Sequence, residues 1–323
     1  MRFTPLRWLP LAALLALSMP AQAAEPTDAR AWIARMQEAA VLRNYRGTMI
    51  VTAGGAASSS KVAHYSVGTQ TFERVETLDG QQHRVYRHND VVHTVWPQSR
   101  EAVVERRGLP RLAGLDAVEP RALEQYELLP QGLQRIAGRE AQVVLLKPRD
   151  ALRFAQRLWS DRASGLMLRA DVLGARGEVL ESSAFSEVEI DIKPQPETVL
   201  QPMNQLDGYR VVRATPLATR LEAEGWTLNG GVAGFALKSC HMRPLVARAA
   251  SATVLQAVYS DGLTHVSLFI EAYDEKRHAG AKPAHLGATH TLMRRHGEYW
   301  ITVMGDVPPL TLERFAQALE RGR

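Results

Sequence analysis

The chain reads YRGTMIVTAGGAASSSKVAHYSVGTQTFERVETLDGQQHRVYRHNDVVHTVWPQSREAVVE from residue 45 to residue 105. Short runs suited to β-strands alternate here with tight turns, and the expected strands are residues 45–52, 62–67, 71–78, 83–88, 91–96 and 102–105. Gly54-Gly55, Asp79-Gly80 and Asn89-Asp90 supply residues that tolerate turn backbones. Connections this short join antiparallel neighbours, because parallel strands need a long crossover. The stretch therefore predicts a broad antiparallel meander that must curl and form a concave face.

The flanking segments start, cover or extend this sheet. Residues 28–42 carry an apolar helical stripe that includes Trp32, Ile33 and Met36, with Asp28 as a candidate N-cap. Residues 54–60 are small and polar and predict a mobile loop. Helical spacing over residues 115–129, ended by Pro130, predicts an inserted helix that lies over the concave face. Strands are expected again at residues 133–136, 142–146, 153–159, 166–173 and 179–192.

The second half of the chain predicts a separate, smaller domain. Residues 193–207 contain three prolines without periodicity and are interpreted as a linker. Residues 208–323 follow as an α+β unit of one antiparallel sheet and one helix that begins at Pro309. Its strands are expected near residues 209–213, 235–241, 253–260, 264–273, 289–294 and 298–304. The predicted first domain spans residues 24–192.

The first 23 residues predict a secretory signal peptide. Two arginines precede an apolar core at residues 9–17, and Ala21-Gln22-Ala23 forms a cleavage signal. A membrane anchor is the alternative, but it would need about 20 continuous apolar residues. We therefore expect an exported protein. Cys240 is the only cysteine, so no intramolecular disulfide can form, and a buried, inert thiol is expected.

Composition and motifs argue against several classes of function but do not identify one. The formal net charge is +5, which in an exported protein favours phosphate-bearing lipid or an acidic protein partner over nucleic acid. The sequence contains no nucleophile elbow, zinc-protease motif, phosphate-binding loop or C-x-x-C pair. We expect no enzyme activity, no cofactor and no metal; an envelope hydrolase is the remote alternative.

Two groups of residues suggest binding. The first could line an apolar cavity under a lid, although ordinary core is the alternative interpretation for each member: Val92, Trp96, Leu109, Leu112, Leu115, Phe154 and Leu158. The second could form a rim for phosphates or acidic side chains, with a solvated surface as its alternative: Arg84, Arg87, Arg106, Arg107 and Arg111.

Ordered motifs along the chain resemble the RseB and MucB family of periplasmic sigma-E regulators. In the first half they are Leu78-Asp79-Gly80, residues 83–87, residues 89–97, residues 135–139, residues 158–161, residues 168–171 and residues 177–181. In the second half they are Tyr259-Ser260-Asp261-Gly262-Leu263 and residues 303–309. The chain departs from the family pattern at residues 54–60 and 149–151.

The resemblance implies a fold and a role. The implied first domain is a curved antiparallel half-barrel, similar to the lipoprotein carriers LolA and LolB, with helices over its hollow. The implied function is to bind the periplasmic segment of a transmembrane anti-sigma factor (RseA or MucA), to protect it from the site-1 protease, and to release it when lipid or lipopolysaccharide binds. A homodimer is plausible by the same resemblance. The alternative function is that of a periplasmic lipid or lipoprotein carrier.

Overall fold

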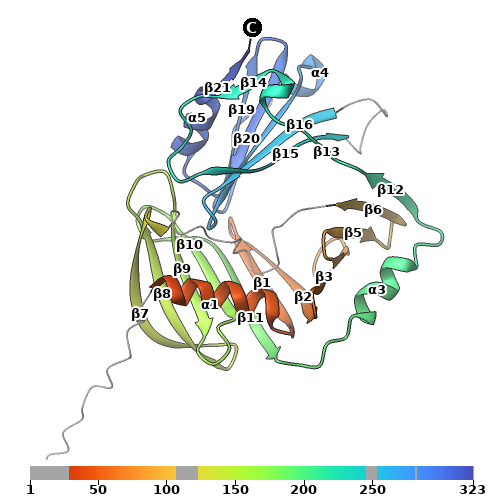
Figure 1. Ribbon diagram of the computed structural model, residues 1–323, viewed down its shortest axis with the longest axis vertical. Coiled ribbons are helices and arrows are strands. Elements are labelled where there is room, and N and C mark those ends of the chain that lie inside the picture. Colours follow the sequence, from red (N-terminus) through yellow and green to blue (C-terminus); the bar gives the residue numbers. More distant parts are fainter. Residues whose placement is uncertain (1–28, 107–122, 245–252, 281, 323) are drawn as a thin grey trace, which may run out of the picture.

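The computed structural model describes residues 29–106, 123–244, 253–280 and 282–322. These residues form two large sheets and a two-stranded one, with few helices, which is the expected α+β class (Figure 1). The first domain is built on a curved 12-stranded sheet whose edges do not meet, so the expected half-barrel is confirmed as an open antiparallel sheet.

The strands of the first sheet follow the meander that the turns predict. In chain order they are β1 (Tyr45–Ala53), β2 (Ala56–Val67), β3 (Gln70–Thr77), β4 (Arg84–His88), β5 (Val91–Trp96), β6 (Glu101–Arg106), β7 (Tyr126–Ile136), β8 (Arg139–Pro148), β9 (Ala155–Asp161), β10 (Met167–Leu173), β11 (Val179–Ile190) and β12 (Arg210–Ala214). Antiparallel pairing of β1 with β11 joins the β1–β6 meander to the β7–β11 meander.

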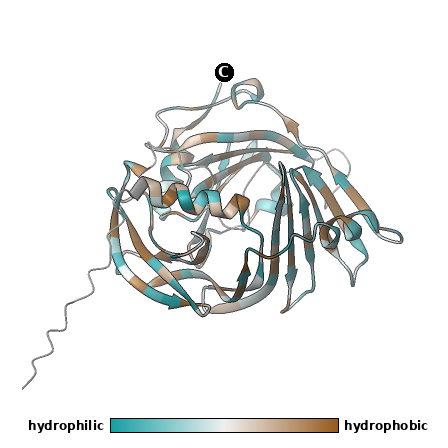
Figure 2. Cartoon of the chain, turned by 60° about the horizontal axis from the view of Figure 1, so that its bottom comes forward, coloured by the Kyte–Doolittle hydropathy of each residue, from teal (hydrophilic) through white to brown (hydrophobic). Residues whose placement is uncertain are grey.

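Helix α1 (Ala29–Leu42) covers part of the hollow. Trp32, Ile33 and Met36 are buried in one cluster with Val144 and Leu158 of the sheet. Figure 2 shows α1 lying across the open side of the curved sheet, whose strands alternate between hydrophilic and hydrophobic residues. The apolar stripe expected from the sequence is therefore the face that packs on the sheet.

Two sequence expectations are wrong in this domain. Residues 56–60 belong to β2, because the turn needs only Gly54 and Gly55. Residues 126–129 are not helical: they open β7, which pairs along its length with β8. β7 is an edge strand with a register shift after Pro130, and a proline is tolerated in such a strand. Residues 115–122 of the predicted inserted helix lie outside the described part of the chain.

The segment interpreted as a linker is also more ordered than expected. Residues Glu197–Asn204 form helix α3, which buries Val199 and Met203 against the face of the first sheet that carries Phe72 and Tyr86. The next strand, β12, was assigned to the second domain, but it pairs in parallel with β6. The first sheet therefore extends to Ala214.

The second domain is a 7-stranded antiparallel sheet with helix α5 (Pro309–Ala318) packed on it. Its strands are β13 (Leu217–Ala218), β15 (Ala236–Pro244), β16 (Thr253–Ser260), β17 (His265–Ala272), β18 (Ala284–Leu286), β19 (Thr289–His296) and β20 (Tyr299–Gly305). Short pieces complete it: η1 (Glu222–Glu224), β14 (Trp226–Leu228), α4 (Glu275–His278) and β21 (Leu319–Arg321). Phe315 of α5 is fully buried beside Tyr259, and Cys240 is buried as expected.

Candidate functional site

A cavity of about 770 Å³ lies between the two domains. One wall is the end of the first sheet, formed by β4, β5, β6 and β12, and the other is the end of β15 in the second domain. Its lining residues are Gln81, His83, Val85, Thr94, Trp96, Ser99, Glu101, Ala102, Val103, Glu105, Arg210, Val212, Ala214, Arg243 and Pro244.

The floor of the cavity is an apolar row that strand register creates. Val85 lies opposite Thr94, Thr94 opposite Val103, and Val103 opposite Val212, so one face of four neighbouring strands points the same way. Trp96 shares this face, and its ring stacks loosely on His83 with the ring centroids 6.5 Å apart. The cavity therefore offers a hydrophobic surface with an aromatic side chain at one end.

The charged side chains of the cavity are arranged in pairs. Arg210 of β12 pairs with Glu101 of β6, and both belong to the first domain. Arg243 of β15 pairs with Glu105 of β6, so this second ion pair connects the two domains across the cavity. Arg243 also donates to Oε1 of Gln256 at 2.7 Å. An anionic ligand would have to compete with these glutamates for the guanidinium groups.

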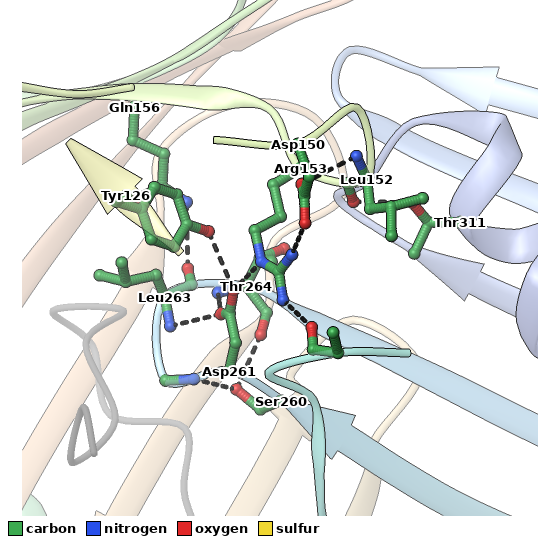
Figure 3. A network of polar contacts seen from close by, with 12 residues as sticks. Tyr126, Asp150, Leu152, Arg153, Gln156, Ser260, Asp261, Leu263, Thr264 and Thr311 are labelled. Atoms are coloured by element: carbon green, nitrogen blue, oxygen red, sulfur yellow. Dashed lines mark hydrogen bonds and ion pairs between the residues drawn. The ribbon is translucent and has the colours of Figure 1, made fainter. Parts of the chain in front are cut away.

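A buried polar network joins the domains at a second place (Figure 3). The Asp261 carboxylate, in the turn between β16 and β17, accepts from Arg153 Nε at 2.7 Å and from the Tyr126 hydroxyl at 2.9 Å. Its other oxygen accepts from the backbone N–H groups of Leu263 and Thr264, at 3.0 and 2.9 Å. The side chains of Arg153 and Asp261 are both fully buried. Burial, and then the Asp261 carboxylate, raise the pKa of Tyr126, so its hydroxyl stays a donor.

A third contact joins the turn after β1 to the turn before β19. An added Cβ on Gly287 would come within 2.8 Å of the Ala53 Cβ, and one on Gly54 within 2.8 Å of the Leu286 side chain. Nearby, Glu181 of β11 accepts a hydrogen bond from the backbone of Ala288. Burial and the neighbouring Asp306 carboxylate raise the pKa of Glu181. Among the described residues, the two domains thus meet at the cavity, at the Asp261 network and at this pair of turns.

The residues predicted to line a cavity do not form one group. Trp96 lines the cavity described above, whereas Val92 is fully buried on the same face of β5. Leu158 belongs to the core under α1, and the Phe154 ring contacts His290 of the second domain with centroids 5.8 Å apart. Leu109, Leu112 and Leu115 lie outside the described residues.

The arginines predicted to form a rim do not lie together around one site either. Arg87 is buried and pairs with Glu73 at 3.1 Å, while Arg84 pairs with Glu76 at 3.2 Å. Residues three apart on a strand point to opposite faces, so these two arginines do not face the same space. Arg106 is exposed and pairs with Asp90 at 2.8 Å. Arg107 and Arg111 lie outside the described residues.

The sequence interpretation missed Arg210, Arg243 and the two glutamates that they pair with. Arg210 enters the site because β12 pairs with β6 across more than a hundred residues of chain, and no local pattern encodes that pairing. The sequence does predict a strand at residues 209–213, but as part of the second domain. Nothing in the sequence around Arg243 distinguishes it from a solvated arginine.

Metal-binding groups and membrane-spanning helices are features of a different kind. Within it, no three His, Cys, Asp or Glu residues are grouped so as to hold a metal ion. None of the described helices is long and apolar enough to cross a membrane.

An apolar cavity between two domains, lined also by paired charges, is typical of a binding protein. Comparison with known families identifies which one. The MucB/RseB N-terminal domain model matches residues 28–203, and the MucB/RseB C-terminal domain model matches residues 220–320. The chain therefore belongs to the MucB/RseB family.

Individual relatives match along nearly the whole chain. The sigma factor AlgU regulatory protein MucB of Pseudomonas aeruginosa is 27% identical, over 97% of this chain and 98% of the relative. The sigma-E factor regulatory protein RseB of Haemophilus influenzae is 24% identical, over 99% of both chains. A crystal structure of MucB in complex with MucA(peri) superposes with a TM-score of 0.66 and 26% identity, covering 92% of this chain and all of that one.

Proposed function

We propose that this protein is a periplasmic negative regulator of an envelope-stress sigma factor, and that it binds the periplasmic segment of a transmembrane anti-sigma factor. The observation that carries the proposal is the likeness, along both domains, to a MucB structure determined in complex with MucA(peri). The cavity between the domains supports it, because an extended peptide segment can place apolar side chains on the floor around Trp96. Binding would shield that segment from the site-1 protease.

Release by lipid or lipopolysaccharide is the second half of the proposal. The cavity floor suits an acyl chain, and phosphates would compete with Glu101 and Glu105 for Arg210 and Arg243. A ligand that opens the Arg243–Glu105 pair would act on both domains at once. Lipid would displace the partner to the extent that it binds the free protein more tightly than the complex.

The decisive experiment follows cleavage of the purified periplasmic segment of the anti-sigma factor by its site-1 protease. We expect the wild-type protein to slow cleavage and lipopolysaccharide to restore it. De-acylated lipopolysaccharide keeps the phosphates but lacks the chains, so we expect it to restore cleavage much less. Absence of protection would contradict the regulator, and protection that lipopolysaccharide leaves intact would contradict lipid release.

Substitutions in the cavity floor test whether the cavity itself binds the anti-sigma segment. We expect Trp96→Ala to weaken binding of the partner segment by roughly tenfold, since large aromatic residues at such sites commonly contribute this much. Val91→Ala is the matched control, because Val91 lies on the same strand but packs on the opposite face. Equal loss in both variants would show that the cavity has no special role.

A periplasmic lipid or lipoprotein carrier is the second candidate, favoured by the apolar floor of the cavity. A carrier moves lipid from one membrane to another without an anti-sigma partner. Transfer of a fluorescent lipid between vesicles, measured with and without the protein, separates the two functions. Self-association of the chain also stays a prediction, which the molar mass in solution tests.

A further inference from the structure

The buried guanidinium group of Arg153 has partners in both domains. Its Nε donates to Asp261, its other nitrogens reach Asp150 and the carbonyl of Ala233, and its guanidinium lies 4.8 Å from the centroid of the Phe235 ring. Asp261, Ala233 and Phe235 belong to the second domain, whereas Arg153 and Asp150 belong to the connection between β8 and β9. One buried cation is therefore satisfied only when both domains are in place.

At this junction, each domain also buries one leucine in the hydrophobic core of the other. Leu152 of the first domain is buried in the core of the second, in the cluster that contains Phe315. Leu263 of the second domain is buried in the core of the first, in the cluster that contains Trp32. A hydrogen bond holds each leucine: Thr311 Oγ1 donates to the Leu152 carbonyl at 2.6 Å, and Gln156 Nε2 donates to the Leu263 carbonyl at 3.1 Å.

These contacts favour two arrangements of the domains, fully docked and fully separated, and make intermediate positions costly in free energy. Full separation would return Arg153 and Asp261 to water, where both charges are solvated. A shift of a few ångströms would leave both charges buried and without their partners, which is far more costly. Interlocking leucines resist the same shift, because packed side chains do not deform continuously.

We propose that the Arg153–Asp261 junction is a latch that sets the spacing of the two cavity walls, and that Arg153 is thereby a positioning residue for partner binding. The walls belong to different domains, and Arg243 meets Glu105 only when the domains are docked. Arg153 is absent from the cavity lining, so its effect on binding is indirect. The binding part of this proposal rests on the proposed function; the positioning part does not.

Interdomain distances in the free protein test the positioning part. Spin labels on Arg176→Cys in the first domain and Glu298→Cys in the second occupy exposed turns. Cys240 is buried and stays in place, with its lack of labelling checked in the unsubstituted chain. We expect one narrow distance for the wild-type latch. Arg153→Met, which removes the cation but keeps an apolar stem, should give a broad distribution or a second, longer distance.

Affinity for the periplasmic segment of the anti-sigma factor tests the binding part. We expect Arg153→Met to weaken it by about tenfold or more. Leu168→Ala is the control: Leu168 is buried in a cluster of the first domain that includes neither Leu263 nor a residue of the cavity lining, so stability should fall while distance and affinity stay close to wild type. If Arg153→Met fails to fold, Thr311→Val removes one interdomain hydrogen bond and is judged by the same two readouts.

The outcomes separate the two proposals. A narrow, unchanged distance in the latch variants would overturn the latch. A broad distance with unchanged affinity would overturn the role of Arg153 in partner binding. If the wild-type protein does not bind the segment, the proposed function fails, and the distance measurement alone still decides whether the junction fixes the domains.

Discussion

At the residue scale, buried acids show how much of this fold depends on specific partners. Asp161, at the end of β9, has a side chain that is 2% exposed and accepts from Arg139 at 2.7 and 3.2 Å. It also accepts from the backbone and the hydroxyl of Ser164, at 2.8 and 2.7 Å. Burial alone would raise the pKa of Asp161, but the bonds from Arg139 and Ser164 outweigh it and lower the pKa.

We expect Asp161→Asn to lower the free energy of unfolding at neutral pH by about 2 kcal/mol, a usual value for lost hydrogen bonds to a charged group. Because the native pKa is depressed, the carboxylate stabilises the fold above its unfolded pKa near 3.9, and this stabilisation disappears as the pH falls through the native value. Urea unfolding at several pH values measures it. The exposed Glu189→Gln is the control, and a difference that grows below about pH 4 would contradict the assignment.

At the scale of elements, the pairing of β1 with β11 holds the first sheet together. Gly47 of β1 lies opposite Val188, next to a register shift. A Cβ added there would overlap the carbonyl oxygen of Glu187, so the two strands can approach only where a glycine stands.

We therefore expect Gly47→Ala to reduce the free energy of unfolding by about 2 kcal/mol, in the range found for overpacked sites. Thermal or denaturant unfolding followed by circular dichroism measures it. Ser58→Ala, on the exposed part of the neighbouring strand β2, should stay within about 0.5 kcal/mol of wild type. An equal effect of the two substitutions would show that the close approach is not needed.

At the scale of the whole molecule, each domain completes the hydrophobic core of the other. Leu263 belongs to the second domain by chain position, yet it is buried beside Trp32 and Leu158 of the first. We expect Leu263→Ala to destabilise the first domain by about 2 to 4 kcal/mol, as for other buried leucines. Hydrogen exchange of the α1 and β9 amides measures this across the domain boundary. Protection that changes only in the second domain would contradict a shared core.

Features of this fold could be predicted from the sequence where they depend on residues close together in the chain. The strand at residues 91–96, the stripe of α1 and the start of α5 at Pro309 follow from periodicity and turn or cap chemistry, which act over a few residues. The short turns also predict the antiparallel meander, and the ordered motifs predict the family. The helix expected over residues 126–129 failed because pairing with β8 outweighs the local helical spacing.

The sequence by itself therefore determined most of the strands, helices α1 and α5, their order along the chain and the family of this protein. Only the tertiary structure decided that β12 extends the first sheet, that Arg87 pairs with Glu73, and that Arg153 meets Asp261 across the domain boundary. Local patterns record which face of an element is apolar, but they do not record which distant strand pairs with it or which charge it meets. The candidate cavity brings β12 and β15 to the β4–β6 hairpins through such distant contacts, so its shape and its residues from β12 and β15 could be recognised only once the chain was folded.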